Sequence, residues 1–353
     1  MVGFCTSRSR GNPGDKKFIT KIVKSKPYAR FNFDRYWREQ LFPAGICNEL
    51  RHHLDLPDEV CGAAELMALP EAELAKIEVL VAGWGAIPLT REVLERMPRL
   101  RAVFYAAGDT RGLVADGECF HRGITVMSAN PELARSVAEH TLGLILVSLR
   151  NVWRQATAVK TERRFLRKPG PGTYRSAVGL VGYGAIAREL RALLRPFAID
   201  VLVYDPYLTC EAAEAAVVKR VELIEIFETS DVVSCHLPMN GETRGMLGRE
   251  HFLAMRQEAT FINTARGGVV REEQMLAVLA ERSDLWAILD VLVQDPPEQG
   301  HPVFDLPNVV ITPHIAGCLG KELARIGCFI AEEVGRWRDE RPLRAQVVRA
   351  ISH

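Results

Sequence analysis

Two glycines follow an apolar run and precede a helical pattern, as in sites that bind phosphate groups. Gly182 and Gly184 lie in the segment Gly-Tyr-Gly-Ala-Ile-Ala, directly after the apolar run 178–181. The first glycine permits a tight turn, and the second lets a pyrophosphate approach the backbone at the positive end of the next helix. A second apolar run, 201–204, ends at an acid that can bind ribose hydroxyls. The spacing predicts a dinucleotide site that includes Gly182, Tyr183, Gly184, Ala185, Ile186 and Asp205.

Polar side chains also follow three later apolar runs. His236 ends the run 231–236, Arg266 comes shortly after the run 260–263, and Asp290 ends the run 285–290. The carboxyl ends of parallel strands meet at the edge of the sheet where ligands bind. We therefore expect these side chains to cluster with Asp205 at one site.

The apolar runs that carry these residues predict parallel sheets. Six short runs between residues 178 and 312 alternate with helical patterns, which predicts a doubly wound α/β domain. Before them, the runs 77–82, 101–105 and 124–127, with a helix over 90–97, predict a smaller, flavodoxin-like α/β domain. An apolar helix is expected from Pro131 to about Trp153, buried against a domain or a second subunit.

The last amphipathic pattern, 321–337, is too short to form a domain and is expected to return to the N-terminal domain. The predicted organisation is two Rossmann-like domains. Residues 128–315 form the coenzyme domain, and residues 1–127 with 316–353 form a discontinuous substrate domain. Residues 1–27 are basic and lack an apolar core segment, so we interpret them as a flexible extension rather than a secretory signal.

The composition is that of an ordinary soluble globular protein. The 353 residues are 48% hydrophobic and 25% charged, and the net charge of +1 gives no reason to expect a nucleic-acid partner. No apolar stretch is long enough to span a membrane. The eight cysteines are scattered, without CxxC pairs or His/Cys clusters at metal-ligand spacing. We therefore expect reduced thiols, no metal site and a cytosolic location.

From about residue 75 to residue 340, the chain resembles the D-isomer-specific 2-hydroxyacid dehydrogenases. The resemblance rests on short segments in the family's order and at family-like spacing. They are Val137-Ala138-Glu139-His140, the glycine turn with Tyr204-Asp205-Pro206, His236-Leu237-Pro238, Asn263-Thr264-Ala265-Arg266-Gly267, Leu289-Asp290-Val291, His301-Pro302, and Asn308 through Pro313-His314. The resemblance implies hydride transfer between NAD(H) and a 2-keto acid or D-2-hydroxy acid.

The resemblance also implies three catalytic roles. Arg266 is the catalytic arginine, His314 is the acid/base, and Asp295 is the acidic partner of that histidine. The chemistry agrees with these roles, because reducing a keto acid needs a cation for its oxygens and a proton for the new hydroxyl. A guanidinium is planar and can donate hydrogen bonds to two oxygens at once, and an imidazole titrates near neutral pH.

Further binding positions follow from the same resemblance. Asp290 matches the position that holds the nicotinamide carboxamide, and Asp205 favours NAD over NADP because a carboxylate repels a 2′-phosphate. The backbone amides of residues 107–109 would bind the substrate carboxylate, and the family pairs into homodimers through the region of residues 131–153. Besides the glycine turn, the implied cofactor positions are His236, Leu237, Pro238, Thr243, Ala265 and Asp290. The candidate substrate positions are Ala107, Gly108, Asp109, Trp84 and Tyr105.

The chain departs from the family pattern at several positions. Asp295 stands where glutamate is usual, so it is expected to reach His314 by backbone adjustment or through water. Leu133 stands where relatives often carry asparagine and Cys318 where a small hydroxyl residue is more usual, and both are expected to border the active cleft. Ala187 replaces the third glycine of the turn.

Other interpretations of these residues remain open. Arg266 could be a surface turn residue and His314 a loop histidine, while Trp84 and Tyr105 could be core aromatics. His301 is interpreted as structural, and His236 as a contact to cofactor or backbone without a catalytic role. Two alternative functions share this fold: an NAD-sensing corepressor or scaffold, and a dehydrogenase of formate or phosphite.

Overall fold

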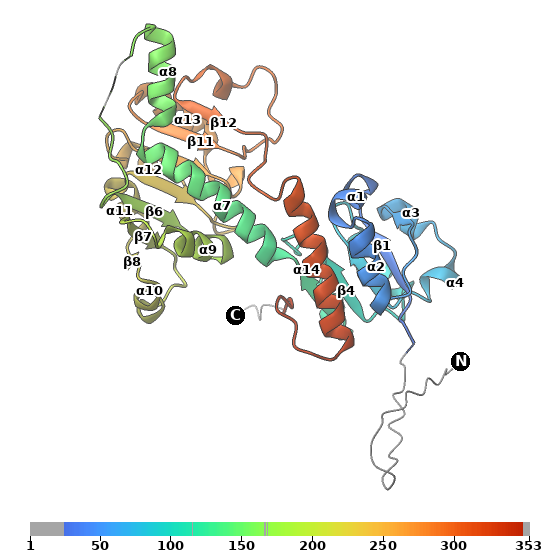
Figure 1. The fold of residues 1–353 in the computed structure, drawn as a ribbon. Helices are drawn as coiled ribbons and strands as arrows, with labels where there is room; N and C mark the ends of the chain where they lie inside the picture. Colours follow the sequence, from blue (N-terminus) through green and yellow to red (C-terminus); the bar gives the residue numbers. More distant parts are fainter. Residues whose placement is uncertain (1–24, 115, 166, 168, 349–353) are drawn as a thin grey trace. The chain divides into compact units, whose positions relative to one another are not determined.

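The computed structural model describes residues 25–114, 116–165, 167 and 169–348, so most of the predicted basic extension lies outside the described residues (Figure 1). The chain divides into two compact units. Unit 1 comprises Met1–Asn130 and Leu323–His353, and unit 2 comprises Pro131–Glu322. The expected domain boundaries, at 127/128 and 315/316, lie a few residues before these divisions.

Unit 1 contains a five-stranded parallel sheet with the order β2-β1-β3-β4-β5. This is the flavodoxin-like order of a doubly wound sheet. The sequence pattern predicts β3, β4 and β5 but misses β1, which carries Arg30 and Asn32, and β2, which has two residues. The strands are β1 (Ala29–Asn32), β2 (Val60–Cys61), β3 (Val79–Ala82), β4 (Ala102–Tyr105) and β5 (Thr125–Ser128).

Helices cover both faces of this sheet. Leu66, Leu94 and Cys119, from three short helices, pack in the core on one face. On the other face, Phe104 of β4 contacts Trp337 of α14 (Lys321–Arg338), with ring centroids 5.9 Å apart. The remaining helices of the unit are η1 (Arg35–Trp37), α1 (Arg38–Leu41), α2 (Ala44–His53), α3 (Ala63–Met67), α4 (Glu71–Leu74), α5 (Arg91–Glu95) and α6 (Glu118–His121).

Unit 2 contains a seven-stranded parallel sheet with the order β12-β11-β10-β9-β6-β7-β8. Read from β8 to β12, with β6 counted as strand 1, the order is 3-2-1-4-5-6-7. This is the doubly wound dinucleotide-binding order extended by one strand, which confirms the predicted fold class. The prediction of six strands is wrong by one, because β8 is an exposed Lys-Arg pair without an apolar signal. The strands are β6 (Ala177–Val181), β7 (Asp200–Tyr204), β8 (Lys219–Arg220), β9 (Val232–Cys235), β10 (Thr260–Asn263), β11 (Trp286–Leu289) and β12 (Val309–Ile311).

Three helices cover each face of this sheet. Apolar residues of α7 (Asn130–Leu149), α9 (Ala185–Leu194) and α10 (Cys210–Ala216) form one core. Those of α11 (Leu223–Thr229), α12 (Arg249–Ala254) and α13 (Glu272–Glu281) form the other, and η2 (Gly267–Val269) and η3 (Pro302–Asp305) lie in loops. Nowhere in the described chain is a helix both long and apolar enough to cross a membrane.

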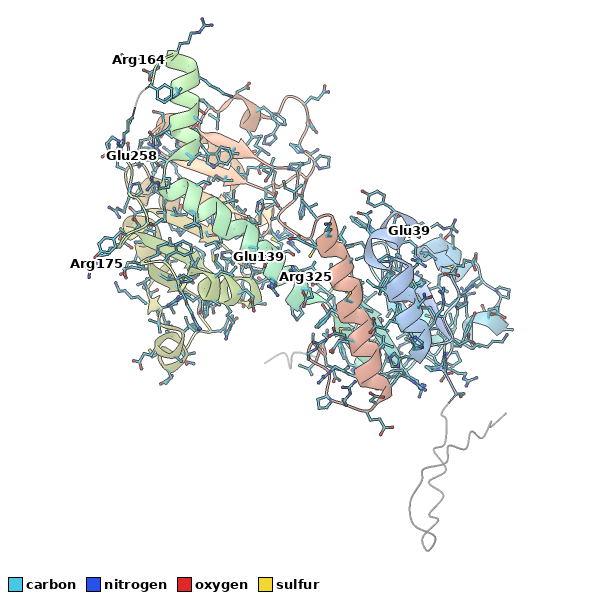
Figure 2. All side chains as sticks on the ribbon, in the orientation of Figure 1. Glu39, Glu139, Arg164, Arg175, Glu258 and Arg325 are labelled. Atoms are coloured by element: carbon cyan, nitrogen blue, oxygen red, sulfur yellow. The ribbon has the colours of Figure 1, made fainter. Side chains whose placement is uncertain are left out.

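The predicted helix from Pro131 to Trp153 is two helices. Helix α7 ends at Leu149, Asn151 adopts a left-handed φ of 53°, and α8 (Val152–Glu162) begins after it. Arg154 of α8 donates to the backbone carbonyls of Glu258 and Asp284, at 3.3 and 2.6 Å. Glu258 is labelled in Figure 2. The sequence pattern did not predict the break between α7 and α8, because apolar residues continue on both sides of it. The chain turns at Asn151, which is buried.

Two helical glycines provide a matched test of the helix packing. A Cβ on Gly327 of α14 would lie 1.8 Å from the carbonyl oxygen of Leu41, so Gly327→Ala must displace α14. We expect a loss of about 3 kcal/mol in the free energy of unfolding. A Cβ on Gly143 of α7 would meet nothing within 4 Å, and Gly143→Ala should stabilise by about 0.5–1 kcal/mol. Thermal denaturation measures both changes, and equal midpoints for the two variants would contradict this packing.

Candidate active site

The turn between β6 and α9 has the geometry needed to bind a phosphate group. Gly182 has a φ of +93°, and a Cβ there would lie 3.1 Å from the backbone of His236, so the turn requires glycine. Gly184 is the N-cap of α9, and a Cβ on it would meet nothing within 4 Å. No described side chain caps the first turn of α9, so the amides that begin with Ala185 and Ile186 are open to an anion.

The carboxylate of Asp205 is tied to the same turn. Its Oδ2 accepts a hydrogen bond from the amide of Tyr183 at 2.7 Å, and its Oδ1 accepts one from the amide of Tyr207 at 2.8 Å. A carboxylate has about four acceptor positions, so both oxygens retain capacity for ribose hydroxyls. The turn and the acid therefore fit a dinucleotide: amides for its pyrophosphate and acceptors for a ribose.

The loop after β9 lies beside this turn. His236 is 8% exposed, its Nε2 lies 3.0 Å from Ser234 Oγ, and burial lowers the pKa of its imidazole to about 4. Its Nδ1 has no hydrogen-bond partner among the described residues, so the ring is neutral and one nitrogen is unsatisfied. Leu237 is buried, Pro238 is exposed, and the hydroxyl of Thr243 donates to the Pro238 carbonyl and closes the loop.

Arg266 lies on a turn after β10 that its neighbours shape. The buried amide side chain of Asn263 donates to the carbonyl of Arg266 at 3.1 Å and accepts from the amide of Ala265 at 3.0 Å. The next residue must be glycine, because a Cβ on Gly267 would lie 2.0 Å from the carbonyl of Leu292. The exposed guanidinium donates to the Ala265 carbonyl, and no carboxylate of the described chain pairs with it. It is therefore available to an anionic ligand.

Asp290, after β11, organises the loop that carries His314. It is 2% exposed. Its Oδ1 accepts from the Thr312 hydroxyl at 2.6 Å and from the amide of Ile315 at 2.8 Å, and its Oδ2 accepts from the amide of Ala316 at 2.8 Å. The carboxylate is thus largely used in holding residues 312–316, besides any contact it makes with a cofactor.

His314 and Asp295 are in direct contact. The Nδ1 of His314 lies 2.7 Å from the Oδ2 of Asp295, so the expectation of a bridging water is wrong. His314 has a left-handed φ of 54°, a conformation that histidine adopts more readily than most residues. The two side chains are 55% and 37% exposed, so the pair is accessible.

In unit 1, residues 106–109 form the loop after β4, which we call the anion loop. The hydroxyl of Ser128 donates to the carbonyls of Ala107 and Gly108, at 3.0 and 2.6 Å, and accepts from the amide of Asn130. In a trans peptide the carbonyl and the following amide point in opposite directions. Ser128 therefore turns the amides that follow these carbonyls, those of Gly108 and Asp109, away from itself. Within the described residues, the amides of Ala107 and Gly108 have no partner.

The other candidate substrate residues of unit 1 are partly engaged. The carboxylate of Asp109 forms an ion pair with the guanidinium of Arg111. Trp84 is half-buried and contacts Trp37, with ring centroids 4.8 Å apart. Tyr105 is also half-buried, and burial raises the pKa of its hydroxyl.

The sequence pattern missed two residues of this arrangement. Ser128 orients the anion loop, and Glu272 contacts His301 and the loop that contains Asp295. Neither belongs to a recognisable motif, since each acts through backbone groups distant in sequence. Leu133 is half-buried on α7, and the Sγ of Cys318 lies 3.1 Å from Ser136 Oγ. In the described chain, no three His, Cys, Asp or Glu residues are grouped as metal ligands.

Known proteins resemble this chain over most of its length. Residues 142–316 match the D-isomer specific 2-hydroxyacid dehydrogenase, NAD binding domain. The chain is 30% identical over 257 residues to a Methylorubrum extorquens glycerate dehydrogenase, covering 70% of this chain and 77% of that protein. It is 32% identical over 260 residues to a Methanocaldococcus jannaschii D-3-phosphoglycerate dehydrogenase, covering 73% of this chain but only 49% of that longer protein. A Rhizobium etli phosphoglycerate oxidoreductase has the same fold, with a TM-score of 0.77 and 23% identity, over 92% of this chain and 99% of that one.

Gly184→Ala tests whether the open space at the start of α9 holds the cofactor. The added methyl meets no protein atom within 4 Å, so the thermal midpoint should stay within about 2 °C of the unchanged protein. A methyl that obstructs the pyrophosphate should weaken NADH binding by about tenfold or more. Titration of NADH fluorescence measures the affinity. Unchanged affinity would place the pyrophosphate elsewhere.

The neutral His236 predicts a specific loss of stability in acid. Its folded-state pKa, about 4, lies below the ordinary value of 6.5, so the unfolded chain takes up the proton first as the pH falls. Stability is therefore lost between pH 6.5 and pH 4. Between pH 7 and pH 4.5, the cofactor-free protein should lose roughly 2 to 3 kcal/mol more than His236→Gln. Chemical denaturation at both pH values measures this difference, and equal losses in the two proteins would contradict it.

Proposed function

Because the chain belongs to the D-isomer-specific 2-hydroxyacid dehydrogenase family, we propose that it interconverts a 2-keto acid and its D-2-hydroxy acid with NAD(H). The family consists of NAD-dependent oxidoreductases, and unit 2 contains its NAD-binding domain. The observation that carries the proposal is the direct contact between His314 and Asp295, together with an arginine that has no acidic partner in the described chain. A proton donor and a free cation are what keto-acid reduction requires of a protein.

The cofactor is proposed to bind along the carboxyl edge of the unit 2 sheet. The amides at the start of α9 would bind the pyrophosphate, and Asp205 would accept hydrogen bonds from the adenosine ribose. When bound, NADH supplies the hydride. A 2′-phosphate would meet the negative charge of Asp205, so we expect preference for NAD(H) over NADP(H).

Arg266 is proposed to bind the keto acid. Its guanidinium can donate to a carboxylate oxygen and to the carbonyl oxygen, and it keeps its charge at all working pH values. In the carbonyl, negative charge develops on oxygen as the bond is reduced, and a nearby cation stabilises that charge. The amides of Ala107 and Gly108 are proposed to bind the substrate carboxylate, because neither has a partner among the described residues and Ser128 turns the Gly108 amide away from itself.

His314 is proposed to donate the proton to the new hydroxyl and to accept it in the reverse direction. Its Nδ1 faces Asp295, which leaves Nε2 for the substrate oxygen. A carboxylate at Nδ1 selects the ring tautomer and stabilises the imidazolium. Reduction needs the protonated ring, so its rate should fall as the pH rises, while oxidation of the hydroxy acid should become faster.

The substrate side chain is proposed to be small and polar, by analogy with two relatives. These are named as dehydrogenases of glycerate and of D-3-phosphoglycerate. The corresponding keto acids are hydroxypyruvate and 3-phosphohydroxypyruvate, and a panel of substrates should include both.

We also propose a cytosolic homodimer. Val152 and Trp153, at the start of α8, are 42% and 37% exposed, and such apolar residues are suited to a subunit interface. The seven described cysteines form no disulfide, as in proteins of a reducing compartment. A solution molar mass of one chain, 39.4 kDa, would exclude the dimer. Neither a nucleic acid nor a membrane is proposed as a partner.

The activity can be tested with a panel of substrates. NADH oxidation is followed with hydroxypyruvate, 3-phosphohydroxypyruvate, glyoxylate, pyruvate and bulkier keto acids, and NAD reduction with formate and phosphite. We expect turnover of at least one keto acid, and a decrease of about 10²–10⁴-fold in kcat for His314→Gln.

Three other outcomes would each contradict the proposed reaction or the proposed role of His314. NADH binding without turnover would indicate an NAD-sensing scaffold or corepressor. Turnover of formate or phosphite alone would indicate a different dehydrogenase. Keto-acid reduction at an undiminished rate in His314→Gln would show that another group donates the proton.

A further inference from the structure

Glu272, the first residue of α13, connects two parts of unit 2 that flank Asp295. Its Oε1 lies 3.2 Å from Nε2 of His301, and its Oε2 accepts from the amide of Val293 at 2.9 Å. The side chains of Glu272 and His301 are 11% and 19% exposed, so the contact is largely shielded from water. We call the Glu272–His301 pair, with its bond to Val293, the strut.

The hydrogen bonds of His301 identify its tautomer. Its Nδ1 accepts from the amide of Val303 at 3.3 Å, as the N-cap of η3. An Nδ1 that accepts carries no proton, so the proton of the neutral ring is on Nε2, where it is donated to Glu272. Both Glu272 oxygens therefore have a donor, and both His301 nitrogens are satisfied without a charge on the ring.

The strut binds the backbone of the loop that contains Asp295. Within residues 291–300, all of which are described, Val293 has the only backbone amide with a hydrogen-bond partner. Asp295 lies two residues after this amide, and its side chain is 37% exposed. Little protein therefore surrounds the carboxylate, and its position depends on the backbone of the loop.

The same loop contacts the turn of Arg266. The carbonyl of Leu292 would lie 2.0 Å from a Cβ on Gly267, so the two backbones are in close contact. Val293 follows Leu292 directly, and its amide is the group that Glu272 holds. One carboxylate thus secures the backbone that lies against the Arg266 turn and presents Asp295 to His314.

We propose that Glu272 and His301 are positioning residues, which hold the 291–300 loop so that Asp295 stays in contact with His314. The inference rests on the proposed function, because it assigns the strut a role in the proton transfer by His314. Displacement of a catalytic group by about 1 Å can reduce a rate by as much as 10²-fold, so loss of the strut should affect catalysis. It acts through Asp295 and touches neither substrate nor cofactor.

The test uses Glu272→Ala and His301→Asn in the full chain. Asparagine is a favoured N-cap residue, so His301→Asn keeps the hydrogen bond from the amide of Val303. Its shorter side chain no longer contacts Glu272. We expect kcat for keto-acid reduction to fall about three- to tenfold in either variant, with NADH affinity changed by less than about twofold. Asp295→Asn should lower kcat in the same way, because it removes the same contact to His314.

Two controls separate this role from a general effect on the fold. Glu273 is exposed in the same helical turn, so Glu273→Ala removes an equal charge from the start of α13 and should leave kcat unchanged. In the Asp295→Asn background, Glu272→Ala should lower kcat little further, since the two changes act on one contact. If Glu272→Ala does not fold, His301→Asn provides the same test.

An unchanged kcat in both strut variants, or a decrease that combines fully with that of Asp295→Asn in the double variant, would overturn the proposal. Hydrogen exchange of residues 291–301 gives a readout that needs no turnover. Exchange should be faster in Glu272→Ala and His301→Asn than in the Glu273→Ala control, and equal exchange would also overturn the proposal. If the unchanged protein reduces no keto acid, the proposed function fails, and faster exchange in these variants would still show that the strut holds the loop.

Discussion

The buried carboxylate of Asp290 imposes a constraint on which the active-site geometry depends. A carboxylate that is 2% exposed must be supplied with hydrogen-bond donors, since leaving such a group unsatisfied costs several kcal/mol. All three side-chain partners come from residues 312–316. The segment after β12 must therefore close around Asp290, and His314, in the middle of that segment, takes a left-handed backbone conformation.

Close contacts between backbones join the successive turns at the carboxyl edge of the unit 2 sheet. Gly182 lies against the backbone of His236, and Gly267 lies against that of Leu292. A side chain at Gly267 would force the two backbones apart, and one at Gly182 would crowd His236 and require a φ of +93°. The cofactor turn is thus joined to the loop after β9, and the Arg266 turn to the loop that bears Asp295.

The anion loop of unit 1 shows the same principle with a different group. A single hydroxyl, that of Ser128, engages two consecutive carbonyls, and the planarity of the peptide then determines where the following amides point. In both units, the groups that could bind ligand are oriented by polar side chains that are themselves buried. Such preorganisation is suited to catalysis, because the donors need not reorient as charge develops on the substrate.

The sequence alone determined the α/β class and most of the sheet strands, because buried parallel strands require apolar runs. The glycine turn and the strand ends also indicated Asp205, Arg266 and Asp290, whereas Asp295 and His314 were indicated by the resemblance to the family. The sequence pattern missed β1, β2 and β8, whose residues are polar or too few to form an apolar run, and the break at Asn151. Only the tertiary structure decided that Asp295 reaches His314 directly, that Asp290 holds its loop, and that Glu272 and Ser128 orient distant backbone groups. Periodicity reports which face of an element is buried, whereas a hydrogen bond between distant residues depends on backbone positions that are set only when the elements pack together.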